Sequence, residues 1–108
     1  MSKFIATRNK GFRMGFDNGF EISVQWGPEN YCERKDHTDF DKPINERFWE
    51  SCSAEIAIFD SKDDSMITLG EDTVEGWVSA DQVAKVIAVV QSAKTINEIK
   101  EKYKALNI

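Results

Sequence analysis

A set of planar and polar side chains gathers at the end of one strand-like run and in the long segment that follows it. Aromatic faces stack on flat rings, and arginine binds phosphate in a bidentate geometry. These residue types therefore predict a site for a nucleotide-like small molecule. They would equally serve as anchors of a protein interface, or pack at one end of a sheet. The candidate ligand-binding residues are Trp26, Asn30, Tyr31, Arg34, His37, Arg47 and Trp49.

Other chemistries find weaker support in the sequence. The acidic run 36–41 surrounds His37 and could hold a divalent cation, although a solvated acidic loop explains it better. Two cysteines and a single histidine are too few for a structural zinc site. A calcium loop beginning at Asp60 would place Lys62 at a ligand position, which excludes it. We expect no metal, no cofactor and no catalytic residues, with a metal-dependent hydrolase around His37 as a remote alternative.

Charge is distributed unevenly along the 108 residues, whose formal net charge is -5. Residues 1–16 carry four basic and no acidic side chains, whereas residues 17–75 carry sixteen acidic and five basic ones. Such an acidic middle repels duplex DNA, so we expect no DNA partner. It fits either a solvated face or an acidic inhibitor that binds a basic host protein.

The length predicts one domain over residues 1–108. No apolar run approaches about 18 residues, so we expect no membrane association. The first residues lack a long apolar stretch, and we therefore expect a cytoplasmic protein.

Apolar alternation predicts a β-hairpin early in the chain. A two-residue loop would place Phe16 opposite Glu21 and mix apolar and polar side chains on one face. A three-residue loop over 17–19 instead pairs Phe16 with Phe20 and makes one face uniformly apolar. That loop requires a left-handed third residue, which Gly19 supplies. We therefore predict the three-residue loop.

The remaining pattern predicts further strands over 4–7, 53–59, 66–69 and 74–78, with an ordered excursion at 27–52. Ser79 and Thr95 each begin a capping-box pattern, followed by apolar residues at helical spacing. Residues 1–78 are thus mainly β, and residues 79–107 form two helices. The expected fold class is α+β, with an antiparallel sheet of about five strands and two C-terminal helices packed on one face.

Several stretches within residues 4–90 resemble small uncharacterised proteins encoded by bacteriophages and prophages. These stretches are Gly11–Met14, Phe16–Phe20, Ser23–Gly27, Asn30–Cys32, Ala54–Ile58 and Gly76–Asp81. The order of antiparallel strands and then two helices is also similar to the anti-Thoeris sponges, phage proteins that sequester a cyclic ADP-ribose immune signal. This resemblance implies a non-enzymatic counter-defence protein that captures a nucleotide-derived signal. The resemblance also implies a homo-oligomer with sites shared between subunits, acting in the host cytoplasm if the protein is encoded by a phage.

Overall fold

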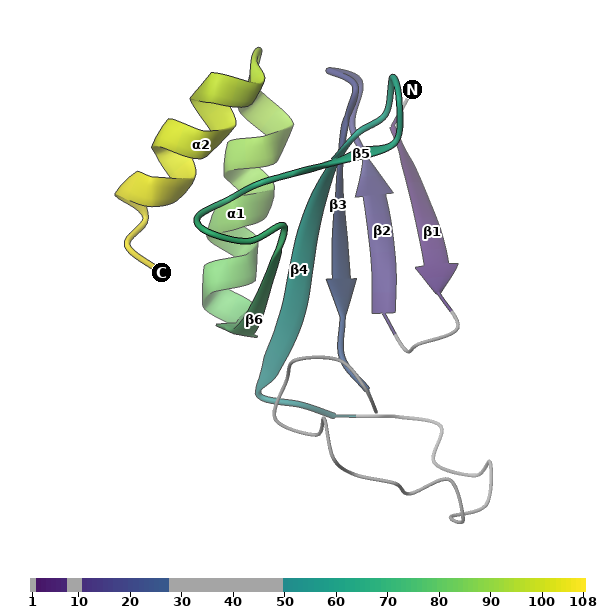
Figure 1. Cartoon of the computed structure of the whole chain (residues 1–108). Coiled ribbons are helices and arrows are strands. Elements are labelled where there is room, and N and C mark those ends of the chain that lie inside the picture. The colour runs from purple at the N-terminus through teal and green to yellow at the C-terminus, as the bar shows by residue number, and fades with distance from the viewer. Residues whose placement is uncertain (1, 8–10, 28–49) are drawn as a thin grey trace.

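The computed structural model describes residues 2–7, 11–27 and 50–108, and shows a sheet with two helices on one side (Figure 1). The strands are β1 (Lys3–Thr7), β2 (Gly11–Gly15), β3 (Phe20–Gln25), β4 (Ser53–Asp60), β5 (Ser65–Ile67) and β6 (Val74–Ser79). The helices are α1 (Ala80–Ser92) and α2 (Ile96–Ala105). The α+β prediction is confirmed: the described residues form six strands of an antiparallel sheet, where about five were expected. Most of the predicted excursion at 27–52 lies outside the described residues.

The sheet has the order β1-β2-β3-β4-β5, and β6 also pairs with β4. The two last strands share one edge of β4: Ile67 of β5 lies opposite Ile58, whereas Val78 of β6 lies opposite Ala54. The register along β6 shifts between Ala54 and Ile56, so β6 carries an irregularity at Gly76 and Trp77. The backbone of Trp77 has a positive φ of 60° at this point.

The hairpin between β2 and β3 has the predicted register. Met14 lies opposite Ile22 and Phe12 opposite Val24. The loop closes through the amide of Phe16, which donates to the carbonyl oxygen of Phe20 at 2.9 Å. Gly19 adopts a φ of 90°, in the left-handed region that a three-residue loop requires. The apolar set therefore points to one face of the sheet.

The core lies between that face and the helices. Ile22, Ile56 and Ile58 of the sheet are fully buried together with Val86 and Val90 of α1 and Ile99 of α2. Helix α1 lies against β3, β4 and β6, and α2 packs alongside α1 (Figure 1). The β-branched residues of α1 are thus held by packing, because their intrinsic helix propensity is low.

Both helices begin at the predicted caps, but only Ser79 forms the full capping box. The Ser79 hydroxyl accepts from the Gln82 amide at 3.2 Å, and the Gln82 side chain accepts from the Ser79 amide at 2.9 Å. At α2 the Thr95 hydroxyl accepts from the Glu98 amide, while the Glu98 carboxylate accepts from the Lys94 amide, one residue before the cap. None of the helices in the described ranges is long and apolar enough to cross a membrane.

The opposite face of the sheet carries a charged cluster. Glu21 is only 6% exposed there and pairs with the Arg13 guanidinium. Arg13 also lies over the ring of Phe59, 4.2 Å from its centroid, and 3.6 Å from a carboxylate oxygen of Asp64. A carboxylate is thus held at low exposure by one arginine and an aromatic ring, on a face that no described helix covers.

Candidate functional site

Of the seven residues proposed from the sequence, only Trp26 lies in the described part of the chain. The other six fall outside the described residues, so the structure neither assembles nor separates the proposed set: Asn30, Tyr31, Arg34, His37, Arg47 and Trp49. Trp26 directly follows β3 and is partly buried against the core. The candidate site is therefore built from Trp26 outward.

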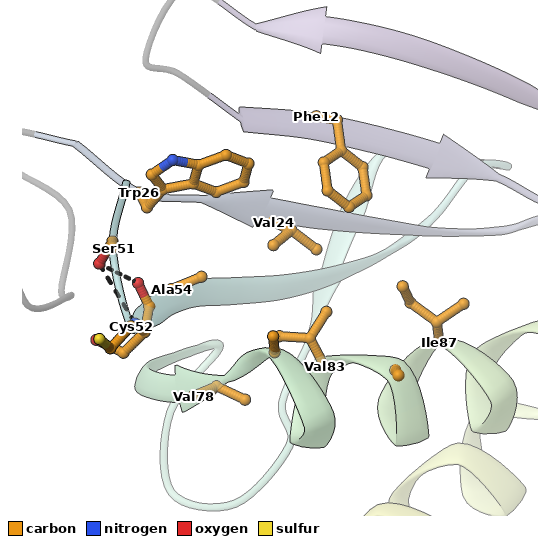
Figure 2. A pocket seen from close by; sticks show the side chains of 12 residues that line it. Phe12, Val24, Trp26, Ser51, Cys52, Ala54, Val78, Val83 and Ile87 are labelled. Atoms are coloured by element: carbon orange, nitrogen blue, oxygen red, sulfur yellow. Dashed lines mark hydrogen bonds between the residues drawn. The ribbon is translucent and has the colours of Figure 1, made fainter. Parts of the chain in front are cut away.

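Trp26 forms one wall of a pocket between the sheet and α1 (Figure 2). The pocket has a volume of about 330 Å³. Its described lining residues come from β2, β3, the start of β4, the end of β6 and the first half of α1. They are Phe12, Val24, Trp26, Ser51, Cys52, Ser53, Ala54, Val78, Ala80, Val83, Ala84 and Ile87.

The alternation of β2 and β3 places the aromatic wall of this pocket. Phe12 and Val24 lie opposite each other and share the helix-facing side with Trp26, two residues further along. The rings of Phe12 and Trp26 meet edge to face, with centroids 6.3 Å apart and planes at 74°. This contact holds the indole beside the pocket in a defined orientation.

Helical spacing supplies the opposite wall. Residues 80, 83, 84 and 87 recur at intervals of three and four, and therefore lie on one stripe of α1. Val83 and Ile87 point toward the sheet in Figure 2, while Ala80 and Ala84 are small and exposed. The short alanine side chains leave space that larger residues would fill, so the pocket opens beside them.

The polar groups of the pocket sit near the start of β4. The Ser51 hydroxyl donates to the carbonyl oxygen of Ser53 at 2.6 Å and also accepts from the Ser53 amide at 3.3 Å. The Cys52 side chain is exposed beside this turn. None of the described lining residues carries a charge. The described pocket is therefore suited to a neutral, ring-shaped group rather than to a phosphate.

Most of this lining could not be predicted from the sequence. The apolar spacing at Val24, Val83 and Ile87 predicts core positions, and these residues do form part of the packed face. The available signal was the pair Ala80 and Ala84, small residues four apart on the same stripe as Val83. Small side chains on a helix that faces aromatic side chains on a sheet predict a gap between them. This prediction requires knowing that the helix and that end of the sheet face each other.

Metal binding has no ligand cluster within the described ranges. No group of three or more His, Cys, Asp and Glu side chains there could hold a metal ion. Comparison with family models, with curated proteins and with solved structures gives no match for this chain.

Proposed function

We propose that this chain is a non-enzymatic binding protein that captures a small molecule by a flat, uncharged ring. The observation that carries the proposal is the apolar pocket beside Trp26, with a volume of about 330 Å³. Ligand sites in proteins are typically concave, mostly apolar and equipped with few polar groups. The Phe12 and Trp26 rings offer aromatic surface, and the turn at Ser51 offers the polar groups nearby.

A nucleotide-derived signal is the ligand class that we propose for this pocket. Its base would enter beside Trp26, and its phosphates would stay outside because the described lining carries no charge. Arg34 and Arg47 are the guanidinium groups assigned to the phosphates, with Asn30 and His37 assigned to the sugar or base edge. Capture without turnover would remove the signal from solution, which is the counter-defence role that the resemblance to phage sponges implies.

The test is binding of a panel of free bases, nucleosides, and linear and cyclic nucleotides, followed by thermal unfolding and calorimetry. A ligand at about 100 times its Kd should raise the free energy of unfolding by about 2.7 kcal/mol. Product analysis should recover the ligand unchanged. If no compound of the panel stabilises the protein, the proposal is overturned. If a ligand is converted to product, the protein is an enzyme and the proposed non-enzymatic role is wrong.

Ala84→Trp is the variant that addresses the pocket itself. Ala84 is exposed at the pocket, so a large ring placed there should occupy the space and weaken binding at least about tenfold. Ala88→Trp is the matched control, since Ala88 is exposed one turn further along α1 and is not among the lining residues. Equal affinity of both variants for the ligand would exclude this pocket as the site.

The phosphate assignment has a test of its own. The double variant Arg34→Ala, Arg47→Ala should weaken binding of nucleotides while leaving the affinity for the free base or nucleoside unchanged. Loss of both would show that the variant has damaged the fold or the ring site. If nucleotide binding is also unchanged, the two arginines have no part in recognition.

A further inference from the structure

The two edges of the sheet differ in how they are protected against pairing with another strand. At one edge, β5 has three residues and β6 contains the irregularity at Gly76 and Trp77. Short strands and bulges are the usual means by which proteins block an edge. At the other edge, β1 runs over five residues in unbroken register with β2, and Lys3 is its single charged residue. No described strand pairs with its outer side.

The backbone groups on that outer side can be identified from the hairpin. The amide of Phe16 donates to the carbonyl of Phe20, so the even-numbered residues of β2 bond to β3. By alternation, the odd-numbered residues of β2 bond to Lys3, Ile5 and Thr7. The amides and carbonyls of Phe4 and Ala6 therefore point away from the sheet.

The side chains of β1 leave apolar surface on both faces of this edge. Phe4 lies on the helix-facing side, opposite Met14, and is 79% exposed. Ile5 lies on the other side and is 36% exposed. In Figure 1 the helices lie on the β4 and β6 side of the sheet, and β1 forms the opposite edge. A strand with outward backbone groups and exposed apolar residues on both faces is a template for pairing.

We propose that β1 pairs antiparallel with β1 of a second copy of this chain, across a two-fold axis at Ile5. In this register Phe4 of each copy lies opposite Ala6 of the other, so all the outward backbone groups of both residues are used. Ile5 faces its own counterpart. Lys3 lies opposite Thr7, which keeps the two lysines at opposite ends of the new ladder.

A second copy is the occupant favoured by the asymmetry of the sheet. Pairing of β1 with the opposite edge of another copy would generate a ring or an open filament, and the short β5 and irregular β6 oppose it. Pairing of β1 with itself is isologous and closes as a dimer. Two five-residue strands bury less than about 1,200 Å² in total, which places the dimer among weak, concentration-dependent complexes.

The first test is sedimentation velocity of the full chain from low micromolar to millimolar concentration. We expect a monomer–dimer equilibrium without larger species. Phe4→Lys should weaken the dimer at least about tenfold, because it removes the apolar contact with Ala6 of the other copy and places the two new lysines diagonally across the ladder from each other. Trp77→Lys is the matched control, since Trp77 is also a largely exposed aromatic residue, 59% exposed, but on β6. It should leave the equilibrium unchanged.

The second test uses the unmodified chain, so it does not depend on the folding of a variant. Amide hydrogen exchange at Phe4 and Ala6 should slow as the protein concentration rises through the dimer transition. The amides of Lys3, Ile5 and Thr7 should exchange slowly at every concentration, apart from fraying at the strand ends. A chain that stays monomeric at millimolar concentration, or a dimer in which Phe4 and Ala6 gain no protection, would overturn the proposal.

Discussion

The side-chain amide of Asn18, in the loop between β2 and β3, caps the C-terminus of α1 by donating to the carbonyl oxygen of Val90 at 2.8 Å. The same nitrogen donates to the carbonyl oxygens of Ala93 at 2.8 Å and of Gln91 at 3.2 Å. The last carbonyls of a helix have no partner within it. No basic residue lies in the last turn of α1. A hairpin loop therefore supplies the cap and ties the first half of the chain to the helical layer.

Asn18→Asp should be at least as destabilising as Asn18→Ala at neutral pH. The alanine loses the bonds to α1 and the bond from the Phe20 amide to Oδ1, at a cost of about 1–2 kcal/mol. The aspartate keeps an acceptor for Phe20, but it places a negative charge against carbonyls at the negative end of the helix dipole. Urea unfolding at neutral pH measures both. An aspartate variant as stable as the parent would show that the capping bonds contribute nothing.

Arg13→Met should destabilise the fold by about 2 kcal/mol or more, because it leaves the carboxylate of Glu21 at low exposure without its partner. The double variant Arg13→Met, Glu21→Met should recover most of that loss, since it removes both charges and keeps apolar packing. Chemical unfolding of both variants checks this expectation. If the double variant is no more stable than the single one, the cost lies in lost contacts of Arg13, such as that with Phe59.

Trp77→Gly should be more stable than Trp77→Ala by about 1 kcal/mol. Both changes remove the same indole, so the difference between them isolates the backbone. At a φ of 60° alanine is strained and glycine is not. In an ordinary strand position the order would be reversed, because glycine loses more conformational entropy on folding. Comparing the unfolding midpoints of the two variants decides which order holds.

Glu98→Gln should make the free energy of unfolding depend less steeply on pH in the acidic range. The Lys94 amide, at 2.6 Å, and secondly the Lys102 ammonium, at 3.1 Å, hold the pKa of Glu98 below its usual value of 4.5. A lowered pKa means stability that is present above pH 4.5 and is lost as the pH falls through the folded value. Unfolding measured from pH 6 downward should show a shallower decline for the variant. Glu101→Gln, on the same helix, is the control and should follow the parent more closely.

Tyr103→Phe should make the free energy of unfolding depend less steeply on pH in the alkaline range. Burial raises the pKa of Tyr103 above 10.0, and the nearby Glu75 charge adds to the effect. A raised pKa means stability that is complete below pH 10 and is lost as the pH rises through the folded value. The parent should therefore lose stability faster than the variant above pH 10. Urea unfolding from pH 8 to 11.5 measures the difference, and parallel curves would contradict it.

The order of elements and the hairpin register were predictable because they depend on neighbours in the chain. Alternation between Phe12 and Val24 leaves one apolar face only if the loop has three residues, and Gly19 suits that loop. The caps at Ser79 and Thr95 are equally local, since each involves residues three or four apart. The α+β class follows from that order. The nucleotide site proposed from the sequence stays a prediction for all its residues, including Trp26.

Features that depend on contacts between the sheet and the helices were decided only by the tertiary structure. Asn18 and Val90 are 72 residues apart, and nothing local marks the loop amide as a cap for α1. The apolar alternation of a strand does not show which strand it pairs with. The sequence therefore could not predict that β5 and β6 both pair with the same edge of β4. The pocket beside Trp26 arises where the Ala80 and Ala84 stripe faces the aromatic end of the sheet. Periodicity determines which side of an element is apolar, whereas only packing between elements determines where that side closes completely and where it leaves a space.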